Sequence, residues 1–356
     1  MALVLCAAVQ PSLAAEEVDG ITRDVIFAAD SDAPGPYRHP TCFDELANGD
    51  LYGVYYGGAG EYEGDTAVYG FRKPKGSDEW TMPTIIADTP GRSEGNGVIW
   101  QAPDGKVWLF YLTRYGDTWS TSRIKYKISS DGAKTWSDPY LLTFEEGMMV
   151  RAHPIVLNNG DYLLPIYHET GHDREVVGAD SSSLFYRYNN DTREWKETNR
   201  VHSRLGNLQP SVVQIDDDYL IAYSRRGGGY GPMKDGFLVR TESRDGGFTW
   251  SPGEDSQFPN PNSATDFIKL ASGNLLLVYN DNNLGQRMPL TVAISDDNTE
   301  SWKYKRDIVN QKGSAAYPTA IQTADGKIHV FYTSHRRRQV NHLTFDESAM
   351  LNSSAE

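Results

Sequence analysis

The feature of this sequence that most constrains its fold is a turn signal that returns about every 55 residues. Each copy is a short polar pair, most often ending in glycine, between two apolar segments rich in aromatic residues. Asn-Gly and Asp-Gly pairs in this setting predict β-hairpins with type I′ turns, in which both central residues adopt positive φ. The six copies are Asn48-Gly49, Asp104-Gly105, Asn159-Gly160, Asp217-Asp218, Ser272-Gly273 and Asp325-Gly326.

A second hairpin follows each of the first five turns by roughly 30 residues and is marked by a tryptophan. Two hairpins per repeat make four antiparallel strands, which is the blade of a β-propeller. The sequence therefore predicts an all-β fold, a six-bladed β-propeller of four-stranded antiparallel blades. The sixth repeat has no such tryptophan, and we expect residues 24–29 to supply its outer strand and close the ring. The five tryptophans are Trp80, Trp136, Trp195, Trp250 and Trp302.

Composition and charge narrow the class of protein. Residues 1–15 form an apolar run that ends in small residues, which is typical of a secretory signal peptide. We therefore expect a signal peptide at 1–15, a single propeller domain at 16–356, and a periplasmic or secreted protein. The formal net charge of −14 argues against nucleic acid, because such partners need a basic surface. No later apolar stretch is long enough to span a bilayer. We also expect the protein to be a monomer.

The tryptophan hairpins carry a recognisable motif. Residues 243–250 read Ser-Arg-Asp-Gly-Gly-Phe-Thr-Trp and match the Asp-box pattern Ser-x-Asp-x-Gly-x-Thr-Trp, and residues 129–136 depart from it only at Ala133. Together with the repeat, these turns resemble the sialidase superfamily, in particular bacterial proteins with BNR/Asp-box repeats. We expect the Asp and Ser of each box to bond the turn and the Trp to pack between blades. Asp131 and Asp245 are therefore predicted to be structural.

Strand direction predicts which face of the propeller holds the site. If the six turns of the first series lie on one face, the residues before each first strand and after each second strand lie on the other. That face is rich in Arg, His, Asn and carboxylates, which suits an acidic oligosaccharide or polysaccharide. The predicted substrate-binding residues are Arg38, Arg151, His168, Gln209, Arg225, Asn262, Asp281, His335 and Arg336.

The resemblance implies a chemistry for this face. Sialidases carry an Arg-x-Pro pattern before the first strand, which Arg38 matches, and a tyrosine nucleophile in the last blade, which Tyr317 matches. The family's acid lies on a loop of the first blade, where this chain offers Glu61 and Glu63, and Glu169 could support Tyr317 as a base. Where the family has two further carboxylate-binding arginines, this chain has Gln209 and Asn262. The resemblance therefore implies an exo-acting glycoside hydrolase of the sialidase-like type, on an acidic, carboxylate-bearing glycan and without a metal or cofactor. The incomplete set of arginines leaves open which sugar it recognises.

Two other functions are compatible with the same face. A polysaccharide lyase or rhamnose-uronate-cleaving enzyme would use histidines with Tyr317 as acid and base, and His39, His153 and His168 stand on the predicted face. A non-catalytic glycan-binding propeller is the second alternative, because fold does not fix function. The i, i+4 spacing of His168 and His172 is typical of a helical zinc site, but these residues follow a strand.

Overall fold

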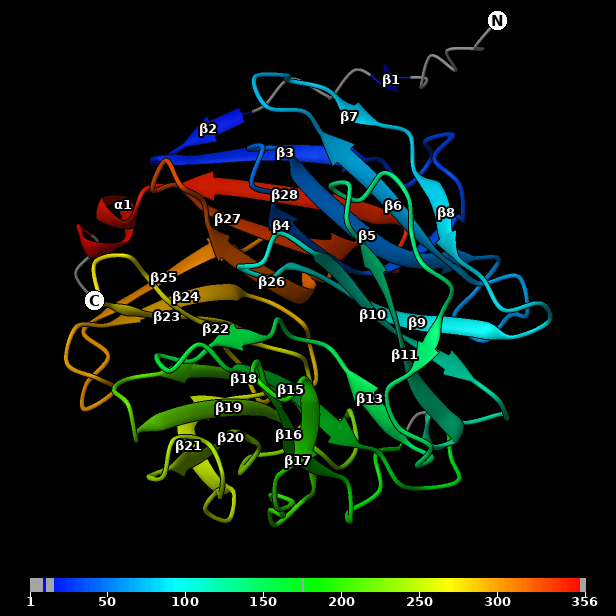
Figure 1. Ribbon diagram of the computed structural model, residues 1–356. Helices are drawn as coiled ribbons and strands as arrows, with labels where there is room; N and C mark the ends of the chain where they lie inside the picture. Colours follow the sequence, from blue (N-terminus) through cyan, green and yellow to red (C-terminus); the bar gives the residue numbers. More distant parts are fainter. Residues whose placement is uncertain (1–8, 11–15, 175, 353–356) are drawn as a thin grey trace, which may run out of the picture.

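The protein folds as a ring of six antiparallel sheets (Figure 1), seen in a computed structural model that describes residues 9–10, 16–174 and 176–352. The sheets of blades 1, 2, 4 and 5 contain four strands in chain order, whereas those of blades 3 and 6 each contain a fifth, short strand. The innermost strands of neighbouring blades contact one another. The predicted all-β, six-bladed propeller is confirmed. The described residues contain one short α-helix, α1 (Glu347–Leu351), and one 3-10 turn, η1 (Trp119–Thr121).

The first three blades occupy the first half of the chain. Blade 3 is irregular at its inner edge, where two short strands, β13 and β14, both pair with β15. The strands are β4 (Tyr37–Glu45), β5 (Leu51–Gly58), β6 (Ala67–Lys73) and β8 (Thr84–Ala87) in blade 1; β9 (Ser93–Gln101), β10 (Val107–Arg114), β11 (Ser122–Ser129) and β12 (Tyr140–Leu141) in blade 2; and β13 (Met148–Val150), β14 (Ile155–Val156), β15 (Tyr162–His168), β16 (Ser182–Asn189) and β17 (Glu194–Glu197) in blade 3.

The last three blades complete the ring. Blades 4 and 5 are regular, whereas blade 6 takes its outer strand from the other end of the chain. The strands are β18 (Asn207–Gln214), β19 (Leu220–Arg226), β20 (Phe237–Ser243) and β21 (Glu254–Pro259) in blade 4; β22 (Asp266–Lys269), β23 (Leu275–Asn280), β24 (Leu290–Ser295) and β25 (Tyr304–Val309) in blade 5; and β26 (Ala316–Gln322), β27 (Ile328–Ser334) and β28 (Gln339–Phe345) in blade 6.

The two ends of the chain close the ring together. Strand β3 (Ile21–Phe27) pairs antiparallel with β28, so the blue and red strands lie side by side in Figure 1. This confirms an N-terminal outer strand in blade 6, although it begins three residues earlier than the predicted 24–29. Strand β2 (Glu16–Val18) pairs antiparallel with β3 and adds one more strand to the outer edge of this sheet. Val9 and Gln10 form a two-residue strand, β1, against β7 (Trp80–Thr81).

The six inner hairpins turn differently from the predicted type I′ geometry. In blade 1 the N–H of Gly49 donates to the carbonyl of Leu46, and the N–H of Leu46 donates to the carbonyl of Asp50. Positive φ falls on Gly49 at 83°, while Asn48 is not among the residues with positive φ. This is a type I turn followed by a single left-handed glycine, the common three-residue hairpin loop. The type I′ prediction was therefore wrong, but the hairpins lie where it placed them.

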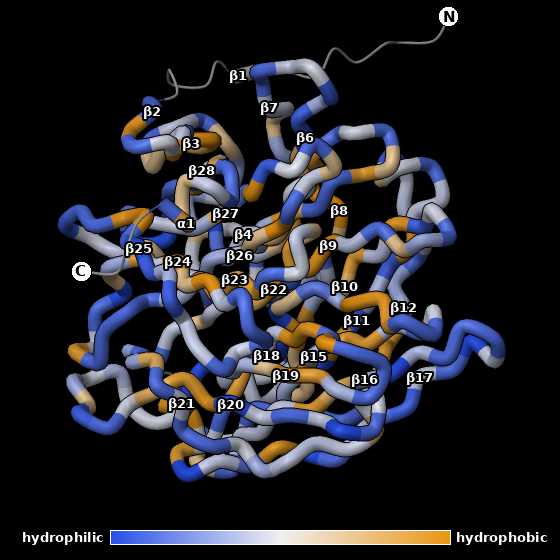
Figure 2. Tube along the Cα trace, turned by 90° about the vertical axis from the view of Figure 1, so that its left-hand side faces the viewer, coloured by the Kyte–Doolittle hydropathy of each residue, from blue (hydrophilic) through white to orange (hydrophobic). Residues whose placement is uncertain are grey.

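Aromatic side chains fill the spaces between blades. Phe43 of blade 1 stacks on Phe331 of blade 6 with ring centroids 3.6 Å apart, and Trp250 of blade 4 stacks on Phe185 of blade 3 at 3.8 Å. Figure 2 shows hydrophobic segments along the inner strands and hydrophilic ones on the peripheral turns. Because buried aromatic surface dominates packing energies, these contacts hold adjacent blades in register.

The Asp boxes act as turn clamps. In the box of blade 4, the Asp245 carboxylate accepts hydrogen bonds from the N–H groups of Phe248 and Thr249 and from the Thr249 hydroxyl, and Ser243 donates to it as well. These bonds offset the effect of burial and lower the pKa of Asp245. The structural role predicted for Asp131 and Asp245 is confirmed, since the same bonds recur at Asp131.

The predicted signal peptide, residues 1–15, lies outside the described residues except for Val9 and Gln10. Across the described part of the chain, no helix combines the length and the apolar character needed to cross a membrane.

We predict that Asp245→Ala lowers the free energy of unfolding by about 1–2 kcal/mol, because several charge-assisted hydrogen bonds of the turn are lost. Urea denaturation monitored by tryptophan fluorescence measures the change. The matched control is Asp191→Ala, at an exposed turn residue, which should shift stability by less than about 0.5 kcal/mol. Equal effects of the two substitutions would contradict the clamp role.

Candidate active site

At or near the start of the first strand of three blades, a left-handed backbone conformation turns one side chain toward the propeller axis. Gln209, Asn262 and Tyr317 all adopt positive φ, at 56°, 62° and 54°. In blades 4 and 6 the ladder is interrupted at these positions by a bulge, and a proline follows the turned residue. Positive φ is unfavourable for residues other than glycine, so its recurrence at equivalent places of three blades indicates a functional constraint.

The hydroxyl of Tyr317 is the centre of the resulting cluster. Arg225 Nη1 donates a hydrogen bond to it at 2.7 Å, and Gln209 Nε2 lies 3.4 Å away. The guanidinium carbon of Arg287 lies 5.1 Å from the centroid of the Tyr317 ring, and that of Arg151 lies 5.5 Å from it. A single buried tyrosine is therefore surrounded by arginines.

This surrounding charge changes the acidity of the tyrosine. Burial alone would raise the pKa of Tyr317, because it disfavours the charged phenolate. The positive charges of Arg225, Arg287 and Arg337 outweigh burial, and the pKa of Tyr317 is lowered below its ordinary value. A tyrosine with a lowered pKa is a better nucleophile or base near neutral pH.

Three neutral side chains hold the guanidinium of Arg225 in place beside Tyr317. Its Nε donates to Asn262 Oδ1 at 2.5 Å, its Nη1 to Gln209 Oε1 at 3.2 Å, and its Nη2 to the Tyr230 hydroxyl at 2.9 Å. Its side chain comes from the end of β19 and is only 2% exposed. All of these partners are neutral, and no carboxylate of the described residues forms an ion pair with Arg225, Arg287 or Arg151. The charge of these arginines is thus available to an anionic ligand.

A fourth arginine, Arg337, reaches the pocket through an unusual turn. His335, Arg336 and Arg337 follow β27 with φ of 52°, 57° and 65°, so three successive residues are left-handed. This turn brings Arg337 against the Glu61 carboxylate, with which it forms an ion pair, and 3.0 Å from the Tyr37 hydroxyl. His335 and Arg336 themselves are exposed.

Glu169 is the carboxyl group best suited to carry a proton in this pocket. It lines the same cavity as Tyr317 and Arg225, just beyond the end of β15. Burial raises the pKa of Glu169 to about 7, against the opposing effect of Arg225 and with a smaller contribution from Glu61. A carboxyl group with this pKa is partly protonated at neutral pH and can act as a general acid.

Aromatic side chains form the remaining wall and narrow the pocket. The indole N–H of Trp119 donates to the Tyr62 hydroxyl at 3.2 Å, and the Asn96 amide donates to the Tyr167 hydroxyl at 3.0 Å. The cavity has a volume of only about 40 Å³, little more than a water molecule occupies. A sugar ring therefore enters only if side chains of this wall move. The lining aromatic residues are Tyr56, Tyr62, Trp119, Tyr167, Tyr230 and Tyr317.

Two predicted residues lie just beneath the pocket. His39 is buried under Tyr317, with ring centroids 4.3 Å apart, and its Nδ1 lies 2.6 Å from the Thr333 hydroxyl. Burial and the surrounding arginines hold the pKa of His39 well below its usual value, so its imidazole is neutral. Arg151 donates from Nη2 to the carbonyls of Tyr317 and Pro318 and so closes the floor.

The structure turns Arg38 away from the pocket. Its guanidinium donates to the backbone carbonyls of Ala28, Ser31, Ala33 and Arg338, and it is 1% exposed. In this arrangement Arg38 ties the segment after β3 to the start of blade 1, and a substrate does not reach it.

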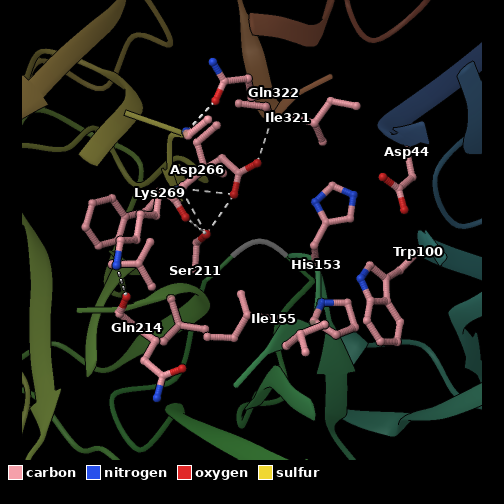
Figure 3. Close-up of a pocket in the computed structure, with 18 of the residues that line it drawn as sticks. Asp44, Trp100, His153, Ile155, Ser211, Gln214, Asp266, Lys269, Ile321 and Gln322 are labelled. Atoms are coloured by element: carbon pink, nitrogen blue, oxygen red, sulfur yellow. Dashed lines mark hydrogen bonds between the residues drawn. The ribbon is translucent and has the colours of Figure 1, made fainter. Parts of the chain in front are cut away.

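The other predicted residues lie outside the central pocket. Glu63, His335 and Arg336 are exposed, His168 pairs with Glu145 at 3.7 Å, and Asp281 pairs with Lys305. His153 lies at the opposite end of the axis, in a separate cavity (Figure 3). The chain after His168 is not helical, so His172 does not share a helical face with it. The predicted residues that the structure does bring together at the pocket are Tyr317, Glu61, Glu169, His39, Arg151, Gln209, Arg225 and Asn262.

Comparison with known proteins places this fold in a family. Residues 49–330, most of the propeller, match the BNR repeat-like domain. The chain belongs to the BNR repeat-like family. This confirms the resemblance to BNR/Asp-box proteins of the sialidase superfamily. Comparison with curated protein sequences finds no match.

Solved structures support the same assignment for this BNR repeat-like propeller. A Hadza microbial sialidase superposes with a TM-score of 0.75 at 15% identity, covering 92% of this chain and 68% of the other. A protein of unknown function from Dyadobacter fermentans gives 0.72 at 14% identity, covering 93% and 100%. The intramolecular trans-sialidase from Ruminococcus gnavus gives 0.71 at 13% identity, covering 91% and 97%. At these identities the similarity establishes the fold.

Sequence reasoning missed Arg287 and Arg337. Both lie in loops after second strands, on the predicted face, but the side chains singled out there were Asp281 and Arg336. Which residue of a loop points inward depends on its backbone conformation, here a left-handed turn at residues 335–337. The run of three arginines at 336–338 was the available signal, although it does not indicate which of the three enters the pocket.

We predict that sulfate raises the melting temperature of this BNR repeat-like protein more than sodium chloride of equal ionic strength does, because an anion relieves repulsion among the clustered arginines. Arg337→Gln should remove most of the difference, and Arg336→Gln, at the exposed neighbour, should retain it. Differential scanning fluorimetry measures both. An equal response to the two salts would contradict an anion site in the pocket.

Proposed function

We propose that this protein is a glycoside hydrolase that removes a terminal acidic sugar from a glycan, with Tyr317 as nucleophile. The observation that carries the proposal is the 2.7 Å hydrogen bond from Arg225 to the Tyr317 hydroxyl, inside a pocket whose arginines outnumber its carboxylates. An acidic sugar supplies the missing negative charge, and the arginines in turn favour the phenolate. The sialidase and the trans-sialidase among the proteins of similar structure are consistent with this activity.

The side chains divide the reaction into two steps. Tyr317, as the phenolate that the arginines favour, attacks the anomeric carbon through Oη, while Glu169 gives its proton to the departing glycosidic oxygen. The glycosyl–tyrosine bond is then broken by water, whose proton returns to Glu169, and the tyrosine leaves as phenolate. Charge is balanced throughout, because Arg225 and Arg287 face the phenolate before the attack and after its release. Glu61, which pairs with Arg337, supports that arginine and is not assigned the acid role.

Substrate recognition follows from the same contacts. The sugar carboxylate would lie on Arg225 and Arg287, whose charges have no carboxylate partner among the described residues. Arg151 closes the floor by bonding the backbone of Tyr317 and Pro318. A blind, narrow pocket admits the end of a chain and excludes its middle, which favours exo action. Trp119 and Tyr62 at the wall provide rings against which a sugar can stack.

Elimination is the second candidate, and the same hydrogen bond favours it. A tyrosine with a lowered pKa can also act as a base, and arginines that neutralise a uronate carboxylate acidify the proton next to it. The two reactions differ in their products, because hydrolysis adds water across the broken bond and elimination does not.

We predict that incubation with sialylated, uronate-containing and rhamnose-uronate glycans yields a free saturated acidic sugar, detected by mass spectrometry. Tyr317→Phe should reduce the rate by about a thousandfold or more, because the nucleophile is lost. The control Tyr332→Phe removes a hydroxyl on β27 of the same blade and should keep activity. An unsaturated uronate product would contradict hydrolysis and identify the protein as a lyase. If none of the glycans is cleaved, a glycan-binding protein would be favoured.

We predict that kcat/KM falls as pH rises through about 7, because the raised pKa of Glu169 means that the acid loses its proton there. Glu169→Gln should lower kcat by about 10²- to 10⁴-fold and abolish that alkaline limb. A pH–rate profile of both proteins measures the effect. An alkaline limb that persists in Glu169→Gln would assign it to another group.

A further inference from the structure

A second cavity opens at the other end of the propeller axis from Tyr317. It has a volume of about 510 Å³ and is lined by the ends of the innermost strands of all six blades. Along β4 the distance from His39, under Tyr317, to Asp44 in this cavity is five residues, or about 17 Å. The floor made by Arg151 separates the two, so this cavity is a different site.

Charged groups of both signs face this cavity. Figure 3 shows Asp44 on one side, Asp266 on the other and His153 between them. Asp44 accepts the backbone N–H groups of Glu45 and Gln101, which leaves part of its carboxylate free toward the cavity. Asp266 is 3% exposed and accepts bonds from Ser211, Phe267 and Ala320.

His153 adds a hydrogen-bonding position that nothing in the fold satisfies. Its Nε2 lies 3.0 Å from the carbonyl of Phe43 and 3.2 Å from Cys42 Sγ. Its Nδ1 makes no hydrogen bond to any residue that the structure describes. Burial alone would lower the pKa of His153, but Cys42 and the carboxylates of Asp44 and Asp266 raise it, so the imidazole is protonated at neutral pH. Its free position is then a donor.

The charges of this cavity select against a charged ligand. A cation would face His153 and the rim residue Lys269, and an anion would face Asp44 and Asp266, so neither gains a net opposite charge. A neutral ligand with many hydroxyls fits both needs, since it donates to Asp44 and accepts from His153. Trp100, Ile155 and Ile321 supply apolar walls for its C–H faces. The volume lies within the range of small-molecule pockets.

We propose that this cavity, which we call the far mouth, is a second binding site that takes a neutral mono- or disaccharide. The site is independent of the chemistry at Tyr317, and its ligand touches none of the arginines of that pocket. The weak affinity usual for a single neutral sugar in an open site is expected, in the millimolar range.

Saturation-transfer-difference NMR on the full protein tests the proposal, with D-glucose, D-galactose, lactose and cellobiose as probes. We expect at least one of these sugars to bind. Asp44→Asn should weaken that binding by about tenfold, because a charged hydrogen-bond partner is lost. Ile155→Arg should abolish the binding, because the longer side chain fills the far mouth. The matched control is Ile85→Arg, on the exposed outer strand β8, which should bind as the native protein does. D-glucuronate and D-glucosamine should not compete for the far mouth.

Three results would overturn the proposal. The first is the absence of binding for every neutral probe at high millimolar concentration. The second is full binding by Ile155→Arg, folded as shown by circular dichroism; if that variant does not fold, full binding by Asp44→Asn decides in the same way. The third is loss of binding in Arg225→Ala with retention in Ile155→Arg, which would assign the sugar to the pocket at Tyr317 instead.

Discussion

The hydrogen bond from Arg225 to the Tyr317 hydroxyl is the interaction on which the site depends. A buried arginine without a carboxylate partner is expensive to desolvate, and the protein stabilises it with neutral acceptor oxygens of Asn262, Gln209 and Tyr230. Because these partners are neutral, the positive charge of Arg225 is not neutralised. The charge then acts on the phenol of Tyr317 and on any anion that enters, so one arrangement both activates the residue and selects the ligand.

The propeller makes this arrangement possible by converging six strand starts on one axis. Gln209, Asn262 and Tyr317 belong to three different blades, and each is turned inward by positive φ, at a bulge in the case of Gln209 and Tyr317. Such strain persists only where the surroundings are rigid. The Asp-box clamps, the aromatic stacks between blades and the pairing of β3 with β28 provide that rigidity on the opposite face and at the rim. The pocket and its framework are therefore physically separate, which allows loops to vary without loss of the fold.

Periodicity predicts much of this architecture but little of the pocket. The glycine turns, the tryptophan hairpins and the closing strand follow from spacing, because each repeat must form the same four-stranded unit. Arg38 illustrates the limit. It is adjacent to His39, and neighbouring residues of a strand point to opposite sides, so only one of the two can face the axis. The structure selects His39, and Arg337 reaches the pocket through a left-handed turn that spacing does not reveal.

Whether the arginines activate Tyr317 is decided by measuring the pKa of its phenol. Difference absorbance titration of the native protein against Tyr317→Phe isolates this one phenol among the 21 tyrosines of the chain. We expect a midpoint below the ordinary tyrosine value of about 10, and a higher midpoint when Arg287→Met removes one of the surrounding charges. A native midpoint at or above that value would contradict the claim that the arginines activate Tyr317, because burial would then outweigh their charge.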